Sequence, residues 1–224
     1  MVLLDAFGTL VAMDPPAPRL RAELASWAGL DVGAEAAEAA FGAEIAFSLE
    51  HHLEGRDAGS LEHLRDRCAG VVAESLGVPG LDQGAVREAM LAAIRFEAQP
   101  DAVAALRALR SHGVRVVVAS NWDCSLGAVL ADAGLLALVD GVVSSAVAGA
   151  AKPDPLLFEA ALAVAETSAE EAVHVGDSPA HDVVGAQAAG VRAILLDRRG
   201  DAEKADVPVI RRLDELPSLV FEAG

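Results

Sequence analysis

VLLDAFGTL, residues 2–10, opens the chain with a short apolar run that ends in Asp5. Consecutive apolar residues predict a buried strand, and the Gly-Thr pair after Phe7 predicts a turn directly behind it. The sequence therefore places a carboxylate at the carboxyl end of a strand, which is where open α/β sheets bind their ligands. Asp5 is the first candidate for a catalytic side chain.

Outward from this stretch, the chain shows two patterns. Residues 15–97 have helical periodicity with breaks at 55–59 and 78–80, and they predict about four helices. Trp27 shares the helical spacing of Leu20 and Leu24, so we expect it to pack inside this block. From residue 100 onward, helical segments alternate with short apolar runs near 114–119, 142–144, 172–175 and 193–196. This alternation predicts a doubly wound parallel α/β sheet. We expect the α/β part to comprise residues 1–13 and 98–224, with an all-α insert over 14–97 and a solvated loop over 198–206.

Composition limits the classes of function. The 224 residues carry a formal net charge of −17, which argues against binding to nucleic acid or to an anionic membrane. No apolar run reaches the roughly 18 residues of a membrane span, and the first residues do not resemble a signal peptide. Two cysteines suggest no disulfide framework, so we expect a cytoplasmic protein. An anionic small-molecule substrate then needs a local positive group, and no oligomeric state is predicted.

Three further motifs each follow a predicted strand. Ser120 and the backbone N–H of Asn121 can hold a phosphoryl oxygen, although a serine at such a position more often caps the next helix. Lys152, in the sequence AKPDP, can neutralise a transferring group or be a solvated loop lysine; it is one of only two lysines. In VHVGDSPAHD, residues 173–182, the carboxylates of Asp177 and Asp182 suit Mg²⁺, or they belong to a capped turn.

The order DxxGT, SN, KPDP and GDSxxxD resembles the haloacid dehalogenase-like (HAD) hydrolases across essentially the whole chain. The resemblance implies a Rossmann-like core and identifies the helical insert as an α-helical cap. It also implies Mg²⁺ as cofactor and a covalent intermediate on an aspartate.

By resemblance, Asp5 is the nucleophile, and Ser120 with the Asn121 backbone binds the phosphoryl group. Lys152 offsets the charge of that group, and Thr9 helps to shape the phosphate pocket. The same resemblance places Mg²⁺ on three groups and gives Asp182 a supporting role toward the metal or Lys152. The three metal ligands are Asp5, Asp177 and the backbone carbonyl of Phe7.

Phe7 departs from the family pattern. Phosphatases of the family usually carry a second Asp two residues after the nucleophile, where it acts as general acid and base. Such catalysis is worth roughly 10²–10⁴-fold. The departure leaves three explanations: a substrate with a good leaving group, an acid from elsewhere such as Asp14, Asp123 or a cap histidine, or weak activity.

The aromatic residue also resembles the 2-haloacid dehalogenase branch, which forms the aspartyl ester without a metal. That branch carries SSNxxD in place of GDSxxxD and a Tyr after the motif lysine, whereas this chain has no Tyr. We therefore expect a Mg²⁺-dependent phosphatase acting on a small phosphorylated metabolite. A dehalogenase-like hydrolase is the second hypothesis, and a low-activity protein that binds a phosphorylated metabolite is the third.

Overall fold

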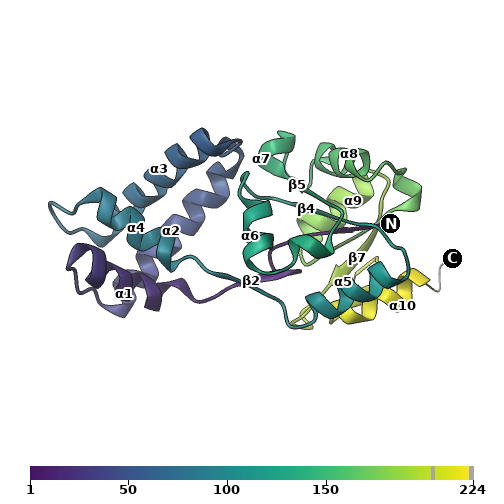
Figure 1. Cartoon of the computed structure of the whole chain (residues 1–224), viewed down its shortest axis with the longest axis horizontal. Helices are drawn as coiled ribbons and strands as arrows, with labels where there is room; N and C mark the ends of the chain where they lie inside the picture. Colours follow the sequence, from purple (N-terminus) through teal and green to yellow (C-terminus); the bar gives the residue numbers. More distant parts are fainter. Residues whose placement is uncertain (203–204, 222–224) are drawn as a thin grey trace. The chain divides into compact units, whose positions relative to one another are not determined.

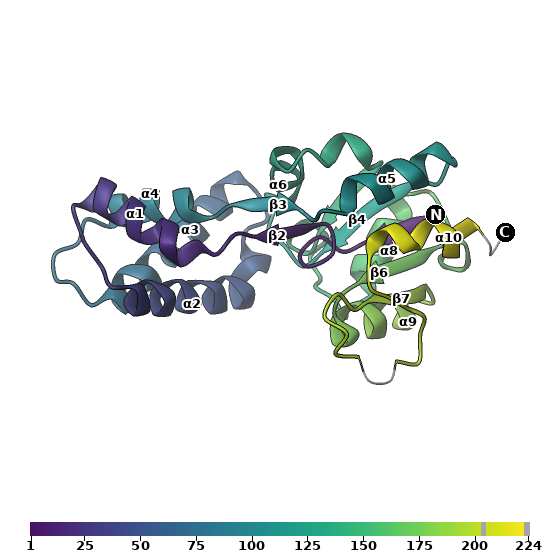
Figure 2. The same ribbon diagram turned by 90° about the horizontal axis from the view of Figure 1, so that it is seen from below.

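The computed structural model describes residues 1–202 and 205–221, which form two compact units (Figures 1 and 2). One unit consists of Met1–Ala12 and Glu97–Gly224, and the other of Met13–Phe96. The first unit is an α/β structure and the second is a set of helices. Each unit is described by itself below.

A six-stranded parallel sheet forms the centre of the α/β unit, in the order β5-β4-β1-β6-β7-β8. Its strands are β1 (Val2–Leu4), β4 (Val116–Ser120), β5 (Gly141–Ser144), β6 (Val173–Gly176), β7 (Arg192–Leu196) and β8 (Val209–Ile210). All three residues of β1 are fully buried, as expected for a parallel strand covered on both faces. The predicted doubly wound α/β fold is confirmed.

The strand order creates a switch point at β1. The chain first adds β4 and β5 on one side of β1, and then β6, β7 and β8 on the other. In register, Leu4 is level with Val118 on one side and with Val175 on the other. The carboxyl ends of three strands therefore meet at one point, the usual location of a ligand site in such sheets.

The helices of this unit are α5 (Ala102–Ser111), α6 (Leu126–Asp132), α7 (Ser145–Ala148), α8 (Pro155–Val164), α9 (Val184–Ala188) and α10 (Leu216–Phe221). Figure 1 shows α8 and α9 on one side of the sheet and α5 with α10 on the other. The α8 side is packed with buried side chains that include Leu3, Val117, Leu157 and Phe158.

The helical unit contains α1 (Pro16–Ala28), α2 (Ala34–His51), α3 (Ala58–Leu76) and α4 (Gln83–Ala93). Their apolar stripes meet in a core around Leu24, Phe41 and Met90. Aspartates start two of these helices: Asp57 forms a capping box at the start of α3, and Asp82 accepts from the first turn of α4. Trp27, whose spacing suggested the interior, is instead 54% exposed.

Three short strands were not predicted. The strands β2 (Val11–Met13) and β3 (Phe96–Ala98), where the chain passes between the units, pair as a two-stranded sheet. The strand β8 lies just beyond the expected loop 198–206, of which residues 203–204 are outside the described residues. Strands of two or three residues are too short to show an alternating pattern.

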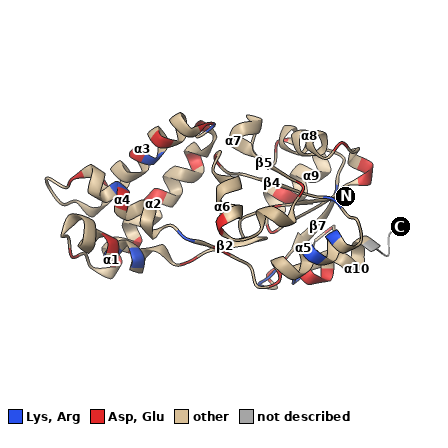
Figure 3. Cartoon of the chain, viewed as in Figure 1, with Lys and Arg blue, Asp and Glu red and all other residues tan. Residues whose placement is uncertain are grey.

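Surface charge follows the composition, with Asp and Glu residues on helices of both units (Figure 3). Within the described residues, no helix combines the length and apolar character needed to cross a bilayer.

Candidate active site

Asp5 lies directly after β1, between the ends of β4 and β6. Its side chain is buried, and Ser120, the last residue of β4, donates its hydroxyl to Asp5 Oδ1 at 2.9 Å. The ammonium of Lys152 donates to the same oxygen. No described residue donates a hydrogen bond to the other oxygen, Oδ2. One oxygen of Asp5 is therefore fixed, and the other is left for a reacting atom or a cation.

Lys152 is buried and shared between two carboxylates. Its Nζ also donates to Asp182 Oδ1 at 2.7 Å. Burial alone would lower the pKa of the Lys152 ammonium, but the carboxylates of Asp5 and Asp182 outweigh burial and raise the pKa above its usual value. Lys152 therefore remains a cation at neutral pH.

Asn121 holds the Lys152 loop through its side chain. Its Oδ1 accepts from the backbone N–H of Lys152 at 2.7 Å, and its Nδ2 donates to the Lys152 carbonyl at 3.1 Å. The sequence predicted a role for the Asn121 backbone only. The amide side chain therefore has a structural function beyond that prediction, because it aligns β4 with the loop that carries the lysine.

Asp182 is held by three donors. Besides Lys152, the backbone N–H of Ser178 donates to Oδ2 at 2.9 Å, and His174 Nε2 lies 2.9 Å from Oδ1. Burial alone would raise the pKa of Asp182, but Lys152 and His174 outweigh it and hold the pKa well below its usual range. With both oxygens engaged, Asp182 is placed to position Lys152.

His174 is a residue that the motif analysis left without a role. Because a carboxylate only accepts, the contact requires a proton on Nε2. Its Nδ1 is buried and has no hydrogen-bond partner among the described residues, so a second proton there would be unsatisfied. Its signal in the sequence is a polar residue inside the apolar strand β6, two positions before Gly176.

The carboxylates of this site are close enough to hold a cation. One oxygen each of Asp5, Asp177 and Asp182 lies within 4.8 Å of the others. Gly8 allows this approach: a Cβ on Gly8 would lie 2.1 Å from Asp177 Oδ2. An all-oxygen donor set suits Mg²⁺, which usually takes one or two protein carboxylates and retains several waters. The residues present thus fit the predicted metal, with Asp5 and Asp177 as the better placed carboxylates.

The loop after β1 is anchored from a distance by Arg198. Its guanidinium donates to the carbonyls of Gly8 at 3.0 Å and Thr9 at 2.9 Å. It also makes a two-pronged ion pair with the buried Asp101, at 2.9 Å for each bond. The expectation of a solvated loop from residue 198 is therefore wrong for Arg198. An arginine two residues after a strand carries no signal that reveals a partner nearly two hundred residues earlier in the chain.

Thr9 is fully buried, and its hydroxyl has no hydrogen-bond partner among the described residues. The structure does not bring that hydroxyl into hydrogen-bonding contact with Asp5 or Lys152. Of the predicted site residues, Asp5, Ser120, Lys152 and Asp182 form one bonded network, to which Asn121 is joined through the Lys152 backbone.

Comparison with known proteins relates this arrangement to a family. A family model described as haloacid dehalogenase-like hydrolase matches residues 1–190. A haloacid dehalogenase-like hydrolase domain-containing protein 3 from Danio rerio is 35% identical over 127 residues, covering 55% of this chain and 52% of that protein. A phosphoserine phosphatase from Thermus thermophilus is 40% identical over 110 residues, covering 46% and 42%. The chain thus spans about half the length of these curated relatives.

A solved structure extends the likeness over the entire chain. The 2-haloacid dehalogenase from Pseudomonas syringae pv. Tomato DC3000 superposes with a TM-score of 0.71 at 25% identity, covering 100% of this chain and 98% of that one. The strand order, the DxxGT, SN and GDSxxxD motifs at strand ends and the match over residues 1–190 agree, whereas α7 separates the KPDP motif from β5. The chain belongs to the haloacid dehalogenase-like hydrolases.

Proposed function

We propose that this hydrolase is a Mg²⁺-dependent phosphatase that acts on a small phosphorylated metabolite through an aspartyl-phosphate on Asp5. The observation that carries the proposal is the buried network in which Ser120 and Lys152 both bind Oδ1 of Asp5. This leaves Oδ2 for attack on phosphorus, next to a carboxylate, Asp177, that fits a cation.

The residues of the site take complementary roles in this reaction. Asp5 attacks phosphorus, while Ser120 and the backbone N–H of Asn121 bind the phosphoryl oxygens. Lys152 supplies positive charge where negative charge develops, and Asp182 holds it in place. Thr9 helps to shape the phosphate pocket from its buried position after Asp5 in the same loop.

The metal would be held by Asp5, Asp177 and the backbone carbonyl of Phe7. When bound, Mg²⁺ neutralises phosphoryl charge and orients the group for in-line attack. Without a cation, a dianionic phosphate would approach a cluster of carboxylates in a chain of net charge −17. The donor set therefore accounts for how an acidic protein can accept an anionic substrate.

Two further assignments belong to the same proposal. We infer that the helical unit Met13–Phe96 acts as the cap that selects substrate, because its helices are inserted between the first two motifs. We also infer a cytoplasmic location, which agrees with the presence of only two cysteines in the sequence.

A dehalogenase-like hydrolysis is the second candidate, and Phe7 is the observation that favours it. An aromatic side chain stands where phosphatases of the family place their acid, and the superposed 2-haloacid dehalogenase has the same fold. The presence of Asp177 beside Asp5 favours the phosphatase. The lack of an acid at Phe7 also agrees with the third hypothesis, a protein of low activity that binds a phosphorylated metabolite.

The test is a screen of phosphate monoesters and 2-haloacids with Mg²⁺ and with EDTA. We expect phosphate release that requires Mg²⁺ and is abolished in Asp5→Asn, together with labelling of Asp5 by beryllofluoride. Halide release that survives EDTA would replace the phosphatase with the dehalogenase. Binding of phosphorylated compounds without turnover or Asp5 labelling would favour the binding protein.

A further inference from the structure

An aromatic pair stands at the position of the missing acid. Phe7 is 48% exposed although it lies two residues after the buried Asp5. Its ring is 6.5 Å from the ring of Trp122, centroid to centroid, at an interplanar angle of 59°. Trp122 in turn lies two residues after Ser120, which binds Asp5. The ring of Phe7, in the loop after β1, and the ring of Trp122, in the loop after β4, therefore lie near each other.

Both rings are carried by anchored backbone. On the first loop, Phe7 is bridged to Val11, and the N–H of Gly8 donates to the Val11 carbonyl at 2.9 Å. On the second, the Trp122 N–H donates to Ser145 Oγ at 3.0 Å, and the Trp122 carbonyl accepts from the same hydroxyl at 3.1 Å. The pair is therefore a preformed apolar surface.

The carboxylates that could replace the acid are already engaged. Asp123 accepts from the N–H of Ser125 at 2.7 Å, and Asp14 forms an ion pair with Arg19 at 2.5 Å. Asp182 is bonded by Lys152, His174 and the Ser178 N–H. With these carboxylates engaged, a leaving group that needs no proton is the explanation for Phe7 that the aromatic pair supports.

We propose that the substrate is a phosphate monoester of a phenol, whose aromatic ring lies against Phe7 and Trp122. The proposal rests on the phosphatase function proposed above. An aromatic substrate is expected because the two rings can pack against an aromatic surface. A phenolate leaving group is expected because the two rings cannot supply a proton.

The chemistry balances without a general acid. Asp5 Oδ2 attacks phosphorus, the ester P–O bond breaks, and its electron pair leaves on the aryl oxygen as a phenolate. The phenolate takes its proton from solvent. Water then attacks the aspartyl-phosphate, releasing inorganic phosphate and restoring the carboxylate. A phenol has a pKa of about 10, whereas an alkyl alcohol is a far weaker acid, so only the phenol departs readily as an anion.

Three matched substrates separate ring contact from leaving-group quality. Phenyl phosphate has an aromatic ring and a good leaving group, benzyl phosphate has the ring with a poor leaving group, and cyclohexyl phosphate has neither. We expect kcat/KM for phenyl phosphate to exceed that for benzyl phosphate by at least about 100-fold, the lower value of a general acid. The KM of benzyl phosphate should be lower than that of cyclohexyl phosphate by up to about 10-fold.

Two variants test the residues themselves. Phe7→Asp should raise kcat on the benzyl and cyclohexyl esters and collapse the preference for phenyl phosphate. Trp122→Leu should raise KM for the two aromatic esters while the dependence on leaving group stays. Circular dichroism and thermal unfolding check that each variant folds. If a variant fails to fold, the relative kcat/KM values of the wild-type protein for the three esters still decide the proposal.

The outcomes distinguish this inference from the proposed function. Mg²⁺- and Asp5-dependent release at similar rates from phenyl and cyclohexyl phosphate would leave the phosphatase standing and overturn the aryl-ester proposal. No Asp5-dependent phosphate release from any of the three esters would overturn both.

Discussion

At the scale of single residues, the buried ammonium of Lys152 connects the carboxylates of the site in the α/β unit. Lys152 joins Asp5 to Asp182, so one buried ammonium offsets part of the charge of two buried carboxylates. Breaking such a pair by removing one partner costs about 3–5 kcal/mol. Substitutions of Lys152 therefore mix stability with activity, and cleaner residue-scale tests come from charges outside this network.

Asp101 offers the first such test. Burial alone would raise its pKa, but hydrogen bonds from Arg198 and from the N–H of Leu213 outweigh burial and lower the pKa below its usual value. A lowered carboxyl pKa adds stability above the unfolded-state pKa of about 3.9, and that stability is lost as the pH falls through the folded-state pKa. Asp101→Asn should cost about 2 kcal/mol of unfolding free energy at pH 7. Denaturant unfolding at pH 7 and pH 3 checks this, and an equal loss at both values would contradict the role of the charge.

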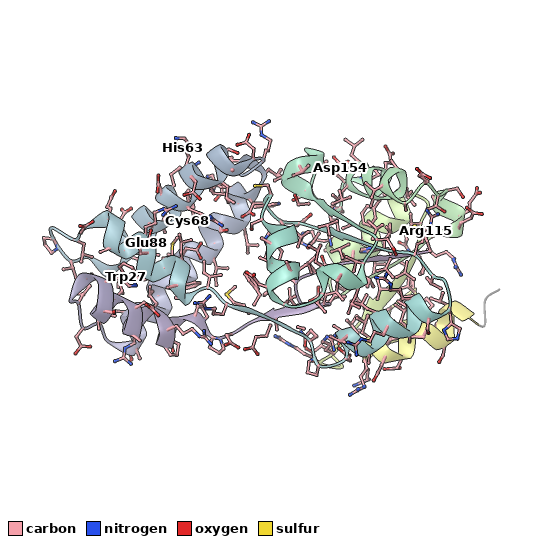
Figure 4. The ribbon with its side chains drawn as sticks, viewed as in Figure 1. Trp27, His63, Cys68, Glu88, Arg115 and Asp154 are labelled. Atoms are coloured by element: carbon pink, nitrogen blue, oxygen red, sulfur yellow. The ribbon has the colours of Figure 1, made fainter. Side chains whose placement is uncertain are left out.

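Glu44 on α2 offers a test of opposite sign. Its carboxyl is buried in the helical unit, and burial raises its pKa, although a hydrogen bond with Cys68 acts in the other direction. Figure 4 shows Cys68 on α3. A raised carboxyl pKa subtracts stability once the pH exceeds the unfolded-state pKa of about 4.3. Glu44→Gln should therefore raise the unfolding temperature by a few degrees at pH 8, with the gain disappearing below about pH 4.

The matched control for Glu44 is Glu38→Gln on the same helix. Glu38 is exposed, so the substitution removes one negative charge without changing a buried group. Calorimetric scans of both variants across pH would show a gain specific to Glu44. The same gain in both would mean that net charge, and not burial, sets the effect.

At the scale of elements, the loop between β1 and β2 brings two motifs together. Arg198 ties this loop by two backbone carbonyls, and Gly8 lets it approach the loop after β6. Gly8 has φ of +81°, a conformation that favours glycine. The turn therefore needs glycine for two reasons, backbone conformation and the closeness of Asp177.

Gly8→Ala separates these reasons when it is compared with Gly113→Ala. A Cβ at Gly8 would displace Asp177, so the Mg²⁺ concentration for half-maximal activity should rise about 10–100-fold. Gly113 has φ of +71°, and a Cβ added there would meet no atom within 4 Å. Its alanine variant should therefore lose about 1 kcal/mol of stability and keep its Mg²⁺ dependence. Magnesium titration of the phosphatase rate checks both. Identical magnesium curves for the two variants would show that Gly8 does not shape the metal site.

At the scale of the whole molecule, an excess of acidic groups surrounds a site that must accept an anion. The net charge is −17, and three carboxylates gather at the switch point of the sheet. A cation that binds only the folded protein stabilises it by about 2.7 kcal/mol at one hundred times its dissociation constant. Metal binding should therefore be visible in the stability of the protein as well as in its activity.

We expect Mg²⁺ to raise the unfolding temperature of the wild-type protein and to leave that of Asp177→Asn unchanged. NaCl of equal ionic strength is the control, because salt alone screens repulsion between surface charges. Differential scanning calorimetry gives the measurement. An equal upward shift in the variant would place the bound cation away from Asp177.

Much of the fold follows from local sequence pattern. The buried run before Asp5, the later alternation of helices and apolar runs, and the helical periodicity of α1 to α4 each reflect contacts within one element. The short strands β2, β3 and β8 were missed because two or three residues carry no measurable period. Trp27 was misplaced because helical spacing shows that residues share a face, but not how far that face is covered.

By itself, the sequence determined that Asp5, Ser120 and Asp177 each follow or end a strand, since a strand and its bounding turn are local. Only the tertiary structure decided that Ser120 and Lys152 share one oxygen of Asp5, and that His174 and Arg198 support the site. It also set Phe7 against Trp122. Most of these contacts join segments far apart in the chain, and their partners are chosen by the order of strands in the sheet, which no local pattern encodes.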